Sequence, residues 1–142
     1  MLRIKYLLAL KAREVWSIEP ESAVLEAIQI MAERHIGALP VMRGTELLGI
    51  VSERDYARKV ILKGRSSADT PVRDIMSTPV TTVSPDEAVH RCMEIMTEQR
   101  IRHLPVVEKG RVVGIVSIGD LVKAVIEEQQ QTISQLERYI AS

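Results

Sequence analysis

Apolar residues along the second half of the chain follow two alternating periods. Over 88–96 they recur every three or four positions, which predicts a helix with one apolar face. Short runs rich in β-branched residues at 104–107 and 112–116, separated by a Glu-Lys-Gly turn, predict two strands. A further short strand is expected at 80–83 and a second helix at 117–126. The pattern therefore predicts a strand-helix-strand-strand-helix unit, and hence a mixed α/β fold (α+β).

Polar residues predict where the helices begin. Ser84, Pro85 and Glu87 fit a capping box, with the serine as cap, the proline in the first turn and the glutamate three residues after the cap. Ser117 is the expected cap of the helix that follows the last strand. In the first half Glu19 occupies the cap position before a proline, which predicts a weaker helix start.

The first half of the chain repeats the pattern of the second. Residues 15–61 align with 80–126 at one constant offset and without a gap, and about 18 of the 47 aligned positions are identical. Both halves contain a Leu-Pro-Val segment followed by a Gly-Ile-Val-Ser-x-x-Asp segment. This self-similarity indicates an internal duplication.

The duplication sets the predicted domain boundaries. Residues 1–62 hold an N-terminal segment and the first repeat, and residues 80–126 hold the second repeat. The polar, turn-rich stretch 63–79 is expected to be a connector with one helical turn at 72–76. Apolar residues at helical spacing in 127–142 predict an amphipathic C-terminal helix that packs on the body or on a second subunit.

Composition and charge narrow the possible functions. The 142 residues carry 19 basic and 19 acidic side chains, and this zero net charge argues against nucleic-acid coating and membrane-surface attachment. One cysteine cannot form an internal disulfide, which fits a reducing cytoplasm. The sequence shows no run long enough for a membrane span or an export signal. A catalytic constellation, a phosphate-binding GxxxxGK loop and a metal-ligand cluster are also not apparent, so enzyme activity is not expected.

The paired motifs carry a family resemblance that covers nearly the whole chain. The Leu-Pro-Val and Gly-Ile-Val-Ser-x-x-Asp segments resemble a tandem pair of CBS domains. The segments 52–60 and 132–140 resemble the stand-alone bacterial CBS-pair proteins of the signal-transduction type. The resemblance implies two β-α-β-β-α units packed about a pseudo-two-fold axis, with adenosine-containing ligands bound in the clefts between the units.

The two Ser-x-x-Asp segments are the candidate binding motifs. A carboxylate at a helix start can accept hydrogen bonds from both hydroxyls of a ribose, and free N–H groups there suit a phosphate. By resemblance, Asp55 and Asp120 would hold ribose, with Ser52 and Ser117 near the sugar-phosphate. The alternative is that each Ser-x-x-Asp segment is a capping box that needs no ligand.

Further candidate residues flank these motifs and differ between the halves. Arg54 precedes the first aspartate, whereas Arg102 and His103 precede the second Leu-Pro segment, so phosphate-binding charge is distributed unequally. The predicted adenine pocket is built from apolar residues near the Leu-Pro segments: Ile36, Leu39, Pro40, Thr82, Ile101, Leu104 and Pro105.

Together these features predict a non-enzymatic regulatory sensor. We expect it to bind AMP or NAD(H), with ATP as a further candidate, because the basic residues suit phosphate groups. Its expected partners are a second copy, giving a homodimer, and an unidentified regulated protein; no nucleic acid and no membrane are expected. The alternative function is a dimerising adaptor with vacant clefts that acts through a protein partner.

Overall fold

The computed structural model describes residues 1–10 and 14–141 and divides the chain into two compact units. One unit contains Glu14–Thr82 together with Lys109–Val112, and hence the first repeat. The other contains Val83–Glu108, the chain from Val113 onward and the N-terminal helix α1 (Ile4–Leu10). Thus α1 lies with the second repeat, whereas the boundaries expected from the sequence grouped it with the first.

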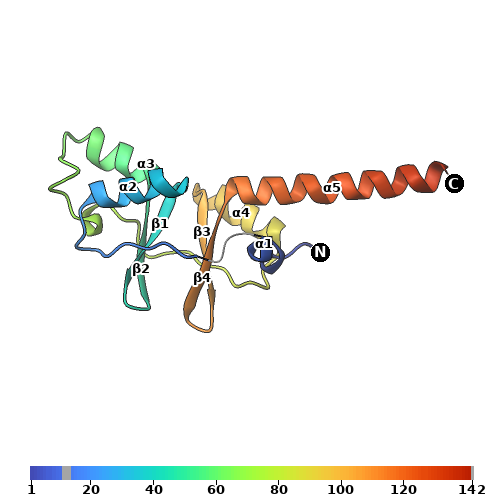
Figure 1. Cartoon of the computed structure of the whole chain (residues 1–142), viewed down its shortest axis with the longest axis horizontal. Helices are drawn as coiled ribbons and strands as arrows, with labels where there is room; N and C mark the ends of the chain where they lie inside the picture. Colours follow the sequence, from blue (N-terminus) through green and yellow to red (C-terminus); the bar gives the residue numbers. More distant parts are fainter. Residues whose placement is uncertain (11–13, 142) are drawn as a thin grey trace. The chain divides into compact units, whose positions relative to one another are not determined.

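Both repeats use the same elements in the same order (Figure 1). In the first repeat, helix α2 (Val24–Arg34) is followed by strands β1 (Ala38–Arg43) and β2 (Glu46–Ser52), and then by the short helix α3 (Glu53–Tyr56). A π-helical turn (Ala57–Ile61) continues α3. In the second repeat the corresponding elements are α4 (Val89–Gln99), β3 (His103–Glu108), β4 (Arg111–Ser117) and α5 (Ile118–Ala141). The predicted mixed fold of two equivalent repeats is confirmed.

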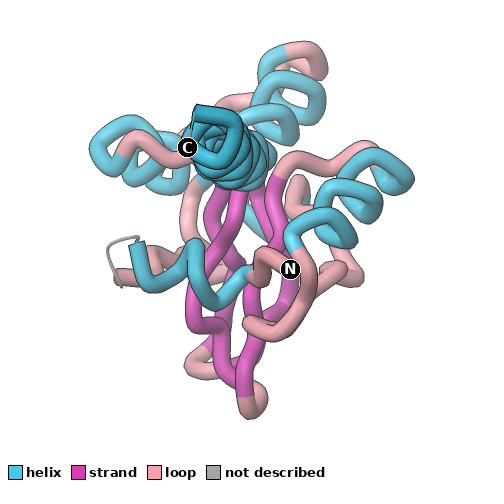
Figure 2. Tube along the Cα trace, turned by 90° about the vertical axis from the view of Figure 1, so that its right-hand side faces the viewer, coloured by secondary structure: helices cyan, strands magenta, loops and turns pink. Residues whose placement is uncertain are grey.

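The strands form one two-stranded hairpin in each repeat, drawn in magenta in Figure 2. In the first hairpin β1 and β2 are antiparallel, with Ala38 opposite Ser52. Lys109 and Gly110 have φ angles of 52° and 75°, so the predicted turn between β3 and β4 uses the left-handed backbone that a tight hairpin requires. The strand expected at 80–83 is only a single parallel bridge from Val83 to Val106.

The predicted capping box at Ser84 is wrong, because α4 begins at Val89 and Ser84–Glu87 is a turn before it. The amide of Glu87 donates to the Ser84 carbonyl at 3.1 Å, which closes that turn. No side chain caps α4; instead the amide of Val89 donates to the Leu2 carbonyl at 3.0 Å. A backbone carbonyl from another segment thus replaces the cap that the sequence suggested.

The first repeat starts its helix in the same way. The amide of Val24 donates to the Thr70 carbonyl at 2.9 Å, and that of Leu25 donates to the Ser67 carbonyl at 3.0 Å. The donors therefore come from α2 and the acceptors from the segment expected to be a connector. This segment also contains the predicted helical turn, observed as a 3₁₀-helix at Val72–Asp74.

The N-terminal segment and the connector are structurally equivalent. Arg3 pairs with Ala88 as Pro71 pairs with Ala23, and Ile4 donates to the Glu87 carbonyl as Val72 donates to the Ser22 carbonyl. Ile4 and Val72 are both fully buried in the core of their own unit. Each repeat is therefore completed by a segment that lies outside the aligned stretches 15–61 and 80–126.

Helix α5 is longer than expected. The sequence pattern predicted two helices, one ending near residue 126 and a C-terminal one at 127–142. The structure has a single 24-residue helix from Ile118 to Ala141. Residue 142 lies outside the described part of the chain. Among the described residues, no helix combines the length and apolar character that crossing a membrane requires.

Because Ile4 is fully buried, Ile4→Ala should lower the free energy of unfolding of the second repeat by about 2–5 kcal/mol, the usual cost of truncating a core isoleucine. The matched control Leu10→Ala removes an 82% exposed side chain from the same helix and should change stability by less than about 0.5 kcal/mol. Chemical denaturation followed by circular dichroism measures both. Equal stability of the two variants would contradict a structural role for the N-terminal segment.

Candidate functional site

The first Ser-x-x-Asp motif lies where β2 passes into α3 and forms a complete capping box. The Ser52 amide donates to Asp55 Oδ2 at 2.9 Å, and the Asp55 amide donates to Ser52 Oγ at 3.1 Å. The Ser52 hydroxyl also lies 3.1 Å from the same carboxylate oxygen. The Ser-x-x-Asp segment therefore caps α3, and the cap fixes the orientation of the Asp55 carboxylate.

The other carboxylate oxygen of Asp55 is engaged as well. Lys59 Nζ lies 3.3 Å from Asp55 Oδ1, and the Ser77 hydroxyl lies 3.5 Å from it. Lys59 is held by a second contact, because its ammonium donates to the Ile75 carbonyl at 2.9 Å. With the Asp55 side chain only 13% exposed, a ribose hydroxyl would have to compete with Lys59 for this oxygen.

The second motif has the same cap with a different neighbour. The Ser117 amide donates to Asp120 Oδ2 at 2.8 Å, and the Asp120 amide donates to Ser117 Oγ at 3.2 Å. The position that aligns with Lys59 is Ala124, which supplies no charge. The two carboxylates are thus held in the same way and differ in their electrostatic surroundings.

The second motif has a basic residue at the start of its helix. The amide of Ile118 donates to the Arg102 carbonyl at 2.9 Å, which places Arg102 beside the N-terminus of α5. Arg102 is exposed and His103, the first residue of β3, is half-buried. A helix N-terminus carries partial positive charge, so α5 and Arg102 act in the same direction. In the first repeat the equivalent carbonyl belongs to Gly37, and the half-buried Arg54 lies on α3.

The residues expected to bind adenine divide into core and surface positions. Leu39 and Leu104 are fully buried, each in the core of its own unit. Ile36 and Ile101 are half-buried at the helix-to-strand connection of their repeats, and Thr82 is exposed directly before Val83. The remaining two expected residues, both buried, are Pro40 and Pro105.

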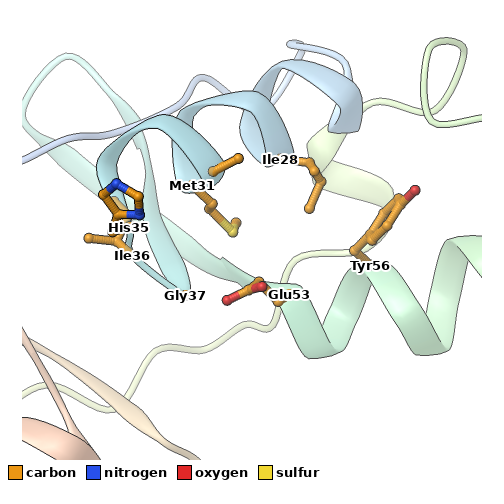
Figure 3. Close-up of a pocket in the computed structure, with 8 residues that line it drawn as sticks. Ile28, Met31, His35, Ile36, Gly37, Glu53 and Tyr56 are labelled. Atoms are coloured by element: carbon orange, nitrogen blue, oxygen red, sulfur yellow. The ribbon is translucent and has the colours of Figure 1, made fainter.

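A pocket of about 460 Å³ opens between α2 and α3 in the first repeat (Figure 3). Figure 3 shows Met31, His35 and Ile36 on the α2 side of it, with Glu53 and Tyr56 on the α3 side. Ile36 is the one predicted adenine-pocket residue that lines it. In the second repeat the position of Tyr56 is occupied by Leu121, which is fully buried in the core. The two repeats therefore also differ in the side chain at this position, which lines the pocket in the first repeat and is buried in the second.

Sequence reasoning missed two kinds of contact around the motifs. Lys59 lies four residues after Asp55, a spacing that brings charged side chains together on a helix, so its signal was present in the sequence. Ser77 approaches Asp55 from the far end of the connector, and no local pattern indicates that contact. Away from the motifs, Trp16 lies against Arg34, whose guanidinium carbon is 3.8 Å from the ring centroid.

The single cysteine is structural. Cys92 is fully buried on the inner face of α4, and burial raises the pKa of its thiol to about 11. The nearby carboxylate of Glu87 acts in the same direction. In the described part of the chain, no group of three or more His, Cys, Asp and Glu side chains is placed to hold a metal ion.

Cys92 should make the fold less stable in alkali. The unfolded thiol ionises near its ordinary pKa of 9.0 while the folded thiol stays neutral, so the free energy of unfolding should fall as the pH rises from 9.0 towards about 11. The part due to Cys92 approaches about 2 kcal/mol at the upper end of this range. Urea unfolding of the wild type and of Cys92→Ala at neutral and alkaline pH measures this contribution. The difference between their pH dependences is due to Cys92, because the variant lacks the thiol. An identical pH slope for the two proteins would contradict the expectation.

The CBS-domain family model matches residues 9–62 and 72–127, and the chain belongs to this family. The mitochondrial CBS domain-containing protein CBSX3 of Arabidopsis thaliana is 43% identical over 125 residues, which are 84% of this chain and 61% of that protein. The match therefore spans less than two thirds of this plant relative.

Solved structures agree in fold over most of the chain. A protein with CBS domains from Burkholderia ambifaria superposes with a TM-score of 0.86 at 46% identity, covering 89% of this chain and 96% of that one. A CBS domain protein from Pyrobaculum aerophilum, complexed with AMP, superposes with a TM-score of 0.77 at 29% identity, covering 92% and 99%. CBS domains are regulatory modules that bind adenosine ligands, and one of these neighbours holds AMP.

Proposed function

We propose that this chain is a non-enzymatic regulatory module whose repeats bind an adenine nucleotide. AMP and NAD(H) are the favoured ligands, and ATP is a further candidate. The observation that carries the proposal is the duplicated strand-to-helix junction with its fixed aspartate, found in a chain that matches an AMP-complexed neighbour over 92% of its length. Catalysis is not part of the proposal, because the motifs supply binding groups without a nucleophile and base.

Asp120 is the proposed principal ribose ligand. A ribose offers two hydroxyl donors, and a carboxylate already oriented by a helix cap can accept from them at little conformational cost. Lys59 already engages Asp55 Oδ1, and Arg102 lies beside the helix N-terminus at which Asp120 is held. We therefore assign Asp55 to a second, weaker site.

The phosphate is proposed to lie at the start of α5. The Ser117 hydroxyl can donate to a phosphate at the N-terminus of this 24-residue helix, whose dipole favours an anion, and Arg102 adds a positive charge beside it. His103 is the second candidate for a phosphate contact. In the first repeat Arg54 would take this role beside Ser52.

The half-buried positions are the best candidates for adenine contacts. Ile101 and Ile36 retain accessible surface, and Thr82 is exposed, so these side chains are available to a ligand. Leu104 and Leu39 are fully buried and would support the pocket wall from behind. Pro105 and Pro40 are buried next to them, and their carbonyls already accept from the amides of Val83 and Ile18, so they too would support the wall.

The regulatory output is proposed to pass to a second copy and to a protein partner. A ligand shifts a conformational equilibrium only through its different affinity for the two states. A homodimer provides such states, because its subunits can change their relative orientation. An adaptor that dimerises with vacant clefts is the competing function.

Isothermal titration of ligand-stripped protein with AMP, ATP, NAD and NADH tests the proposal. We expect saturable heat with a phosphate-bearing adenine ligand and a dissociation constant between micromolar and millimolar, the range in which cellular nucleotide levels act as signals. S-adenosylmethionine is the matched ligand that lacks phosphate. Silence with all five ligands would contradict nucleotide sensing and favour the adaptor.

The two aspartates should contribute unequally to binding. Asp120→Asn keeps an acceptor for the helix cap but removes the charge, and we expect the affinity for AMP to fall roughly 10-fold to 100-fold. Asp55→Asn should have a smaller effect, because Lys59 already engages that carboxylate. Asp86→Asn makes the same charge change at a side chain that is 71% exposed and should leave the affinity unchanged. A larger effect at position 55 than at position 120 would reverse the assignment of the sites.

A further inference from the structure

Helix α5 contains an apolar face that its own repeat does not cover. The first turns of the helix pack on the second repeat through Leu121, which is fully buried, with Ile118 and Val125 packed against the same core. Every residue from 129 to 141 is exposed (Figure 1 shows the red helix continuing to the C-terminus). Large apolar side chains nevertheless continue along this exposed stretch, and exposed apolar surface of this kind marks interaction sites.

These side chains follow a seven-residue repeat. When Ile126 is assigned to position a of a heptad, Ile133 and Ile140 also fall at a, and Val122 and Leu136 fall at d. The exposed fractions of these five side chains are 39% for Val122, 53% for Ile126, 47% for Ile133, 57% for Leu136 and 81% for Ile140. Gln129 occupies the remaining d position. The buried residue Leu121 falls at c, and Ile118 and Val125 fall at g, so the contact with the repeat lies along one edge of the a/d seam and leaves its a and d side chains exposed.

We propose that the a/d seam of α5 pairs with the α5 seam of a second copy to form a parallel two-stranded coiled coil. This inference rests on the homodimer of the proposed function and names the surface that forms it. Isoleucine at a, as at all three a positions here, with leucine at d, as at Leu136, is the combination that favours two parallel strands. A single polar residue at one core position sets the register of such a pair.

Charge favours a second copy over a lipid surface. Helix α5 carries four acidic and two basic side chains, so anionic membranes would repel it. The flanking e and g positions of the seam place no pair of like charges opposite each other in a parallel dimer: Lys123 faces Ile118 of the second copy, and Glu137 faces its Thr132. Self-pairing is therefore free of electrostatic repulsion at its edges.

Gln129 determines the orientation. In a parallel, in-register pair the two Gln129 amides share one layer and can hydrogen-bond to each other. In the antiparallel arrangement that overlaps the seams fully, each Gln129 faces Ile133 of the second copy, which leaves two core amides without a partner. That arrangement would bring Lys123 near Glu137, but exposed ion pairs stabilise too little to offset two unpaired amides.

The seam is short, which sets the expected strength of the dimer. From Val122 to Ile140 it extends roughly 27 Å, just under three heptads. A coiled coil of this length is marginal by itself, so the dimer should dissociate on dilution. Sedimentation velocity over a series from micromolar to hundreds of micromolar protein should show a monomer-dimer equilibrium.

Ile133→Asp tests the surface. It places a charge at the centre of the seam and should halve the mass at concentrations where the wild type is dimeric. Ser134→Asp adds the same charge one residue away, at position b, and should keep the wild-type mass. Circular dichroism checks that both variants retain the fold. A dimer that persists in Ile133→Asp, or a wild type that stays monomeric throughout the series, would overturn the proposal.

Disulfide trapping tests the orientation. In a Cys92→Ala background, which copies Ala27 at the aligned position of the first repeat, Gln129→Cys should form a covalent dimer under mild oxidation because both copies place residue 129 in one layer. Gln131→Cys lies at position f, away from the seam, and should stay monomeric. Equal cross-linking of the two variants, or none at position 129, would overturn the parallel register.

Failure of this interface can be told apart from failure of the nucleotide proposal. The interface is measured by mass and cross-linking without ligand, whereas nucleotide binding is measured by titration. If the Ile133→Asp variant remains dimeric and still gives saturable heat with nucleotide, the coiled coil is overturned and the nucleotide proposal stands. If the wild-type dimer dissociates on dilution but the protein gives no heat with any nucleotide, the sensor function is overturned and the interface stands.

Discussion

The amides at the start of α2 and α4 need hydrogen-bond acceptors, and neither helix has a side-chain cap to supply them. The acceptors are backbone carbonyls of a segment from elsewhere in the chain: Thr70 for α2 and Leu2 for α4. Once these segments are paired to the helix starts, the side chains that follow, Val72 and Ile4, enter the cores. In each repeat the same segment supplies both the acceptor for the helix start and a core side chain, so neither aligned stretch contains all the residues of its own compact unit.

The two repeats hold the same motif in different chemical surroundings. Each repeat fixes an aspartate at the end of its second strand with the same pair of backbone and hydroxyl contacts. The repeats differ in the residues around this aspartate. One helical turn after it, Lys59 in the first repeat corresponds to Ala124 in the second, and on the neighbouring loop Gly37 corresponds to Arg102. The helix cap is retained in both repeats although these neighbours differ, because capping uses only one carboxylate oxygen of each aspartate.

Features that depend on residues close together in the sequence were predicted correctly from the sequence pattern. The hairpins, the turn at Lys109–Gly110 and both Ser-x-x-Asp caps follow from residues close in sequence, and all are present. The helix at Ser84 was wrong because tertiary pairing with the N-terminal segment holds Ser84–Glu87 in a turn. The contact of Ser77 with Asp55 was missed for the same reason, since its partners are far apart in the sequence. The adenine-pocket residues could be placed only in part, because sequence does not separate the fully buried Leu39 from the half-buried Ile36.

Helix α5 carries the proposed nucleotide site at one end and the proposed dimer seam along the rest of its length. Asp120 lies in its first turn, directly after Ser117 at the end of β4, and the seam begins at Val122 in the same continuous helix. If dimerisation alters the position of the first turn by restraining the helix, it alters nucleotide affinity, and nucleotide must then alter dimerisation by the same factor. A module built in this way needs no separate transmission element, because the residue that would bind the ligand and the residues that would bind the second copy belong to one rigid unit of backbone.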